Sequence, residues 1–217
     1  MRLQRNFYLQ PTLKVAKSLL GKIIVRKINK NYLKGRIIET EAYIGPWDLA
    51  SHAKFSYQPT NEKIKILNDF KEKIKDYVDN WEIFSKRILK SPAKLTPRNI
   101  AEFLKGGHIY IYLVYGNFWQ LNITTFKEGY PECVLIRAVE PLKTLNIFPD
   151  GPGKVCQFLK LNKSFLFEDL TKSQRIWLEN GKKKKNEIII TTPRIGIDYA
   201  QSDKFLPWRF ILKKCYN

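Results

Sequence analysis

The stretch RIIETEAYI at residues 36–44 carries the residue types that a hydrolytic site needs. Side chains two positions apart in a strand point to the same side, so Glu39, Glu41 and Tyr43 share one face. We expect the opposite face to pack on the core, and it holds Ile38, Thr40, Ala42 and Ile44. A carboxylate among aromatic rings is partly desolvated and can act as a general base.

Two other strand-like segments complete a chemical face. The hairpin-like stretch 108–124 sets Tyr110, Tyr112, Gln120 and Asn122 against its isoleucines, and CVLIRA sets Cys133, Leu135 and Arg137 against Val134 and Ile136. If these strands are neighbours in one sheet, its non-core face carries Glu41, Tyr43, Tyr112, Asn122 and Arg137. The arginine would keep the carboxylate ionised and fix a water, and the tyrosine rings could sandwich a planar heterocycle.

Each of these residues also has a simpler structural interpretation. The carboxylates of residues 36–44 could be the polar side of a half-exposed strand, and Tyr43 and Tyr112 could be cross-strand packing partners. Asn122 could satisfy a turn, and His52 could be a surface or capping histidine, because Ser51-His52 has no visible triad partner. Strand patterning alone therefore indicates a basic domain with an aromatic, carboxylate-bearing cleft.

The pattern of strand-like and helix-like segments predicts one α+β domain over residues 1–217. We expect a largely antiparallel, curved sheet, peripheral helices and a protruding β-hairpin. Strands are expected at 22–28, 34–44, 108–124, 132–141, 187–192, 194–199 and 208–212, and helices at 11–20 and 154–162, with a short one starting at Thr96-Pro97. A lysine-rich segment at about 54–95 is predicted to be a helical insert. One apolar stripe consists of Ile64, Leu67, Ile74 and Tyr77, and a second consists of Trp81, Phe84 and Ile88.

Composition narrows the classes of function. The formal charge of +19 attracts polyanions, although lysine-rich codon usage would produce the same excess. Three dispersed cysteines and two histidines argue against a disulfide framework and a metal site, and no cofactor is expected. The chain shows no apolar run of membrane-spanning length and no signal-peptide pattern, so we expect an intracellular protein without a membrane partner.

The tip of the hairpin is unusual because it is aromatic. Gly116-Asn117 predicts a two-residue turn, and Tyr115 and Phe118 would bracket it at the outermost point of a solvent-facing loop, where polar residues are usual.

Five ordered blocks closely resemble the alkyladenine family of 3-methyladenine DNA glycosylases. They are RIIETEAYIGPWDLASH at 36–52, TPRN at 96–99, GGHIYIYLVYGNFWQLNI at 106–123, VLIRAVEP at 134–141 and GPGKVCQFLKLNKSF at 151–165. The resemblance extends to PRIGI at 193–197, departs at the 54–95 insert, and is shortened after Pro141.

This resemblance implies a monofunctional, monomeric enzyme that removes alkylated or deaminated purines from double-stranded DNA. By similarity, Glu41 is the general base, and Arg137 and the backbone carbonyl of Ile195 help to hold the water. The residues expected around the flipped base are Tyr43, His52, Tyr112, Asn122, Leu135 and Ile195, with Asn122 disfavouring the 2-amino group of guanine. Tyr115 matches the wedge that fills the gap in the base stack, and further DNA contacts are assigned to Tyr110, Asn117, Arg98, Lys154 and Lys163.

Two other functions remain open at this stage: a non-catalytic reader of damaged nucleic acid and an RNA-modifying enzyme. The expected location is the cytoplasm or nucleoid if the source is bacterial and the nucleus if it is eukaryotic.

Overall fold

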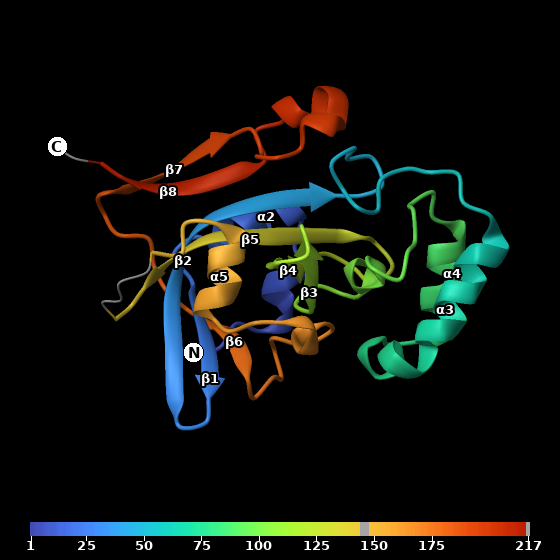
Figure 1. Ribbon diagram of the computed structural model, residues 1–217, viewed down its shortest axis with the longest axis horizontal. Coiled ribbons are helices and arrows are strands. Elements are labelled where there is room, and N and C mark those ends of the chain that lie inside the picture. Colours follow the sequence, from blue (N-terminus) through green and yellow to red (C-terminus); the bar gives the residue numbers. More distant parts are fainter. Residues whose placement is uncertain (144–147, 216–217) are drawn as a thin grey trace.

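One antiparallel sheet organises the part of the chain that the computed structural model describes, residues 1–143 and 148–215 (Figure 1). Within those residues its eight strands are β1 (Ile23–Ile28), β2 (Asn31–Ile44), β3 (Ile109–Val114), β4 (Phe118–Thr124), β5 (Glu132–Pro141), β6 (Ile176–Glu179), β7 (Glu187–Thr192) and β8 (Arg209–Lys214). The strand order is β3-β4-β5-β2-β1-β6, and β8 pairs with both β2 and β7. The predicted α+β class with an antiparallel sheet is confirmed.

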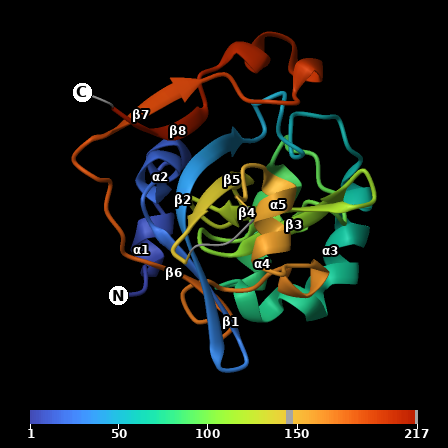
Figure 2. The ribbon, with the colours of Figure 1, turned by 60° about the vertical axis from the view of Figure 1, so that its left-hand side comes forward.

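Helices surround this sheet. The α-helices are α1 (Arg5–Tyr8), α2 (Thr12–Leu19), α3 (Thr60–Ile74), α4 (Trp81–Lys90) and α5 (Pro152–Phe158), and the 3-10 turns are η1 (Lys75–Tyr77), η2 (Ile100–Phe103), η3 (Lys163–Phe165) and η4 (Asp198–Phe205). Helix α2 packs on β2 and β5, and α5 packs on β4 and β5 (Figure 2). Both helices contribute side chains to the main core.

The main core uses the apolar side of the alternating strands. Its sheet residues include Ile109, Ile111, Leu121, Ile123, Val134 and Ile136, as the sequence pattern predicts. In β2 the alternation is interrupted, because the pairing of β2 with β5 shifts register around Ile38. A bulge inserts one extra residue, so Ile37 and not Ile38 is fully buried, while Thr40 and Ala42 keep their predicted core positions.

A second apolar cluster belongs to the 54–95 segment, which contains α3 and α4. Leu67 and Ile74 of α3 and Phe84 and Ile88 of α4 are buried in it, whereas Ile64 is exposed. Lys63 is buried in its place and donates from Nζ to the backbone oxygens of Ile88, at 3.3 Å, and Ser91, at 2.6 Å. The helical pair is therefore joined by polar contacts at the end of α4 as well as by its apolar stripe.

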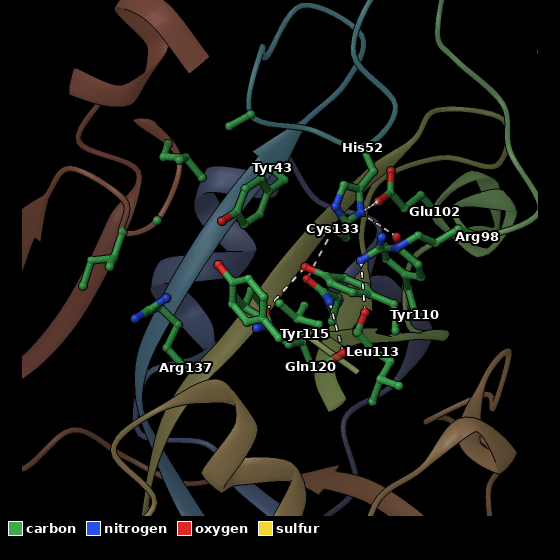
Figure 3. Close-up of a pocket in the computed structure, with 18 of the residues that line it drawn as sticks. Tyr43, His52, Arg98, Glu102, Tyr110, Leu113, Tyr115, Gln120, Cys133 and Arg137 are labelled. Atoms are coloured by element: carbon green, nitrogen blue, oxygen red, sulfur yellow. Dashed lines mark hydrogen bonds and ion pairs between the residues drawn. The ribbon is translucent and has the colours of Figure 1, made fainter. Parts of the chain in front are cut away.

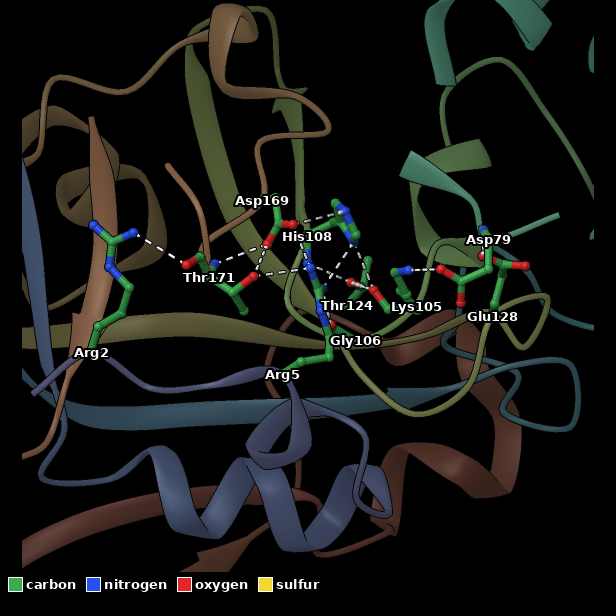
Figure 4. A network of polar contacts seen from close by, with 10 residues as sticks. All are labelled: Arg2, Arg5, Asp79, Lys105, Gly106, His108, Thr124, Glu128, Asp169 and Thr171. Carbon is green, nitrogen blue, oxygen red and sulfur yellow. Dashed lines mark hydrogen bonds and ion pairs between the residues drawn. The ribbon is translucent and has the colours of Figure 1, made fainter. Parts of the chain in front are cut away.

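A polar network connects the N-terminal region, the hairpin strand β3 and this helical pair (Figure 4). The Arg5 guanidinium donates to the Asp169 carboxylate and lies 3.5 Å from His108 Nδ1, whose other partner is the backbone oxygen of Lys105 at 2.8 Å. Lys105 in turn pairs with Asp79, which lies between η1 and α4. Burial lowers the pKa of His108 to about 4, so the ring is neutral at pH 7.

Three local predictions are wrong. Thr96-Pro97 does not start a helix, because Asn99 accepts from Thr96 and η2 begins only at Ile100. Residues 194–199 do not form a strand: the chain bends at Ile195-Gly196, where Gly196 has a φ of 74°, and η4 begins at Asp198. The helix expected at 154–162 is shorter, because α5 ends at Phe158. The structure also contains α1 and β6, which the sequence pattern did not predict.

Candidate active site

A cavity of about 410 Å³ opens on the face of β3, β4, β5 and β2 opposite the main core (Figure 3). Its walls come from the non-core face of these strands, from the loop after β2, from the segment that leads into η2 and η2 itself, and from residues 195–199. The lining residues are Tyr43, Ala50, His52, Arg98, Glu102, Tyr110, Tyr112, Leu113, Val114, Tyr115, Gln120, Asn122, Cys133, Leu135, Arg137, Ile195, Gly196, Ile197 and Tyr199. A cavity of this size, with aromatic walls and polar side chains that include His52, Asn122 and Arg137, can hold a small ligand.

Glu41 lies directly behind this wall and has no exposed surface. Its Oε2 accepts from the Tyr43 hydroxyl at 2.9 Å, and its Oε1 accepts from the backbone N–H of Ile195 at 2.9 Å. Arg137 Nη1 lies 3.4 Å from Oε1. Burial raises the pKa of Glu41, and the Arg137 charge, the Ile195 N–H and the Tyr43 hydroxyl partly offset this effect.

Arg137 is held by a second carboxylate. Its Nε donates to Glu39 Oε1 at 2.8 Å, and Arg209 Nε donates to the same oxygen at 2.6 Å. Because Glu39 on β2 lies between β5 and β8, it connects the strands on both sides. This contact fixes the Arg137 side chain where Nη1 reaches toward Glu41.

A buried ion pair holds the turn that covers Glu41. Arg194 donates to both carboxylate oxygens of Asp48, at 2.6 and 2.8 Å, and to the backbone oxygen of Ala42 at 2.9 Å. Both side chains are fully buried, so the bidentate geometry compensates their desolvation. Ile195 follows Arg194 directly, and its backbone N–H donates to Glu41 Oε1. The expected contact of its carbonyl with the water stays a prediction.

The far end of the cavity is built by His52, Tyr110, Tyr112 and Glu102. His52 Nδ1 lies 2.7 Å from the Tyr110 hydroxyl, and its ring meets Tyr112 edge-on with centroids 4.7 Å apart. Burial lowers the pKa of His52 to about 4, so this ring is neutral at pH 7. Asn99, just before η2, donates to the backbone oxygen of His52 at 3.1 Å and fixes the loop that carries it.

The hairpin tip differs from the predicted turn. Tyr115 and Gly116 both have positive φ, 51° and 72°, and the Asn117 N–H donates to the Val114 oxygen at 3.2 Å. The primed turn is therefore centred on Tyr115-Gly116, one residue earlier than expected. Tyr115 is 90 % exposed, whereas Phe118 packs toward Gly153 of α5 and does not share the tip.

The remaining residues assigned to DNA contacts divide into two groups. Asn117, Arg98, Lys154 and Lys163 are exposed on the surface. Tyr110 is fully buried and contacts His52, so its position does not fit a direct contact with a duplex. Tyr110 is instead an inner wall of the cavity, because alternation along β3 points it to the same side as Tyr112.

Sequence patterning missed three polar groups near the cavity: the Asp48–Arg194 pair and Glu102. All three are buried ionisable residues in or beside loops, where strand periodicity gives no signal. The motif PRIGI contains Arg194, and an arginine directly before an apolar run was the one available hint. No cluster of potential metal ligands occurs in the described part of the chain, and no helix of residues 1–143 and 148–215 could span a membrane.

Comparison with known proteins gives consistent matches along the chain. A family profile described as Methylpurine-DNA glycosylase matches residues 6–67 and 89–216. A Methanocella arvoryzae protein provisionally named 3-methyladenine DNA glycosylase is 35% identical over 96% of this chain and 90% of its own length. The Homo sapiens DNA-3-methyladenine glycosylase is 31% identical over 98% of this chain and 66% of the human protein. A Clostridium tetani protein with the same provisional name as the Methanocella protein is 34% identical over 98% of this chain and 96% of its own length.

Proposed function

The chain belongs to the methylpurine-DNA glycosylase family, and we propose that it is a DNA repair enzyme that hydrolyses the N-glycosidic bond of alkylated or deaminated purines in double-stranded DNA. The observation that carries the proposal is the buried Glu41 carboxylate, held by Tyr43, Arg137 and the Ile195 N–H at the wall of an aromatic cavity. The residues that the family profile leaves unmatched, 68–88, fall in the helical insert.

In the proposed reaction, a water attacks the C1′ carbon of the deoxyribose, the bond from C1′ to the purine nitrogen breaks, and the base leaves with the bonding electrons. Glu41 accepts the proton of the water, and burial that raises the pKa of this carboxyl makes it a better base. Glu41 is covered by Tyr43 and Ile195 in the structure. The proposed reaction therefore requires that a water reach this buried carboxylate from the side of the cavity.

The cavity is suited to a flipped purine. The rings of Tyr112 and His52 meet edge-on at an interplanar angle of 69°, and Tyr43 of β2 forms a further aromatic wall. A purine alkylated at N3 or N7 is cationic, so electron-rich rings bind it by cation–π attraction, and it needs little acid assistance to leave. Asn122 is buried: its Nδ2 donates to the backbone oxygen of Gln120 at 3.4 Å, and its Oδ1 accepts from Cys133 Sγ at 3.8 Å. It is the residue we assign to exclusion of guanine.

The exposed Tyr115 ring would enter the gap that the flipped nucleotide leaves in the base stack. Unstacking costs a few kcal/mol, and an aromatic ring inserted from the minor groove recovers part of that cost. Arg98 supports the same region, since its guanidinium lies 4.6 Å from the Tyr112 ring centroid and donates to the Leu113 oxygen at 3.4 Å.

The excision reaction itself is the test. Purified protein is incubated with duplexes that contain one hypoxanthine or one 3-methyladenine, and the released base is measured by chromatography. Release from the damaged duplex and not from the undamaged duplex supports the proposal. Tight binding without release would identify a non-catalytic reader, and release only from the matching RNA strand would identify an RNA enzyme.

Strand cleavage gives a second readout. A lyase needs an amine that forms a Schiff base with the sugar, and the residues that line the cavity in the described part of the chain include no lysine. The product should therefore be an intact strand with an abasic site, which breaks only after heating in alkali.

A further inference from the structure

Glu102 is a buried carboxyl group at the inner end of the cavity, and the proposed mechanism does not use it. It comes from η2 and is only 2 % exposed. Its Oε2 is buried and has no hydrogen-bond partner within the described residues. Its Oε1 lies 3.9 Å from His52 Nδ1, the same nitrogen that contacts the Tyr110 hydroxyl at 2.7 Å. Figure 3 shows the carboxyl group beside the His52 ring and Tyr110.

The surroundings favour the uncharged form of this carboxyl. Burial raises its pKa well above the ordinary value, and the negative charge of Asp48 acts in the same direction. The nearby Tyr110 hydroxyl and Arg98 offset only part of this effect. Cys133 and Tyr112 are also titratable and lie close by. Burial raises the pKa of both, so both favour their uncharged forms and neither supplies a positive charge that would lower the pKa of Glu102. Burial and the lack of a hydrogen-bond partner for Oε2 among the described residues therefore both favour a protonated Glu102, which can donate that proton.

The position of that proton fixes the hydrogens of its neighbours. A protonated Glu102 donates toward the Tyr110 oxygen, and the Tyr110 hydroxyl then donates to His52 Nδ1. Because neutral imidazole has one N–H, the hydrogen of His52 must be on Nε2. If Glu102 were ionised, the direction would reverse, and Nδ1 would hold the hydrogen.

We propose that Glu102 is a positioning residue that sets substrate preference: through Tyr110 it holds His52 with an Nε2–H donor available to the purine in the cavity. The inference rests on the proposed glycosylase function, since it assigns the base that this site prefers. An N–H donor pairs with a carbonyl oxygen, such as O6 of hypoxanthine, and not with the 6-amino group of an adenine lesion. Deaminated purines would therefore gain more from Glu102 than 3-methyladenine does.

The tautomer can be measured without any activity. The protein has two histidines, so nitrogen-15 spectra of His52 and His108 are simple to assign. We expect His52 to be protonated on Nε2 in the wild type and in Glu102→Gln, whose amide N–H replaces the acid proton. Glu102→Leu and Tyr110→Phe should both lose this fixed tautomer, while His108 stays unchanged as the internal control. A wild-type His52 protonated on Nδ1, or a tautomer unchanged in both disrupting variants, would overturn the proposal.

Excision rates test the consequence for substrates. The ratio of single-turnover rates on hypoxanthine and 3-methyladenine duplexes should fall about tenfold in Glu102→Leu, which is the effect of one hydrogen bond, and stay within twofold in Glu102→Gln. Equal losses on both substrates would assign Glu102 a merely structural role and contradict the preference. Absence of base release from every duplex would instead refute the proposed function, and the His52 spectra would still decide the relay.

Discussion

Tyr115 can be replaced without removing packing from the folded protein, because 90 % of its surface is exposed. Its φ of 51° places a side chain in the left-handed region, which costs about 1–2 kcal/mol for residues other than glycine. Tyr115→Gly removes that cost, while the extra freedom of glycine in the unfolded chain takes back about 0.4–1 kcal/mol. The free energy of unfolding should therefore be unchanged or rise by about 1 kcal/mol.

DNA binding should change in the opposite direction. A base stacked on an aromatic side chain contributes about 1–3 kcal/mol, so loss of the wedge should weaken binding to a duplex with a stable abasic analogue about 5- to 150-fold. Fluorescence anisotropy at one fixed salt concentration measures this affinity. Tyr57→Ala is the matched control, since Tyr57 is 89 % exposed and lies outside the cavity walls. Equal affinities of Tyr115→Gly and the wild type, or equal losses in both variants, would refute the wedge.

Glu39→Gln weakens the support of Arg137 and should lower the single-turnover rate about tenfold, with affinity for the abasic duplex within twofold; a wild-type rate would show that Arg137 needs no such support. Asp48→Asn leaves the Arg194 charge buried without its partner and should reduce the free energy of unfolding in urea by about 3–5 kcal/mol, and a loss below 1 kcal/mol would contradict this. The Glu187 carboxylate accepts from Arg36 Nη1 at 2.8 Å and from Arg36 Nη2 at 2.7 Å, and this pairing lowers the pKa of Glu187 to about 2. The contribution of Glu187 to stability is therefore present above about pH 4.5 and disappears as pH falls toward 2. The unfolding curves of the wild type and Glu187→Gln should therefore differ at pH 6 and converge at pH 2, and a difference independent of pH would exclude this pair.

Much of the cavity was predictable because strand alternation is a local property. Tyr112, Asn122, Leu135 and Arg137 were placed on one face by alternation alone, and the strand order β3-β4-β5-β2 brings them together. The catalytic and binding roles of these residues stay predictions, since they come from the family resemblance.

The groups of the site that the sequence pattern did not predict are placed by contacts between segments that are distant in the chain. Alternation cannot place Asp48 beside Arg194, 146 positions away, or Glu102 behind His52. It also assumes an uninterrupted strand, so it does not predict the bulge around Ile38, where Ile37 is fully buried in place of Ile38. The turn at Tyr115-Gly116 was displaced because Gly-Asn is the stronger local turn signal, whereas the register of β3 and β4 decides which residues occupy the tip.

The central claim is that the carboxylate of Glu41 performs the hydrolysis. Glu41→Gln keeps the size of the side chain and an oxygen that can accept from Tyr43 or Ile195, but it cannot take a proton from water. Single-turnover release of hypoxanthine from a duplex, measured beside affinity for the same duplex, tests this claim most directly. We expect the rate of Glu41→Gln to be at least about a hundredfold lower, with affinity within a few-fold of the wild type. Release of the base at the wild-type rate would show that Glu41 is not the general base.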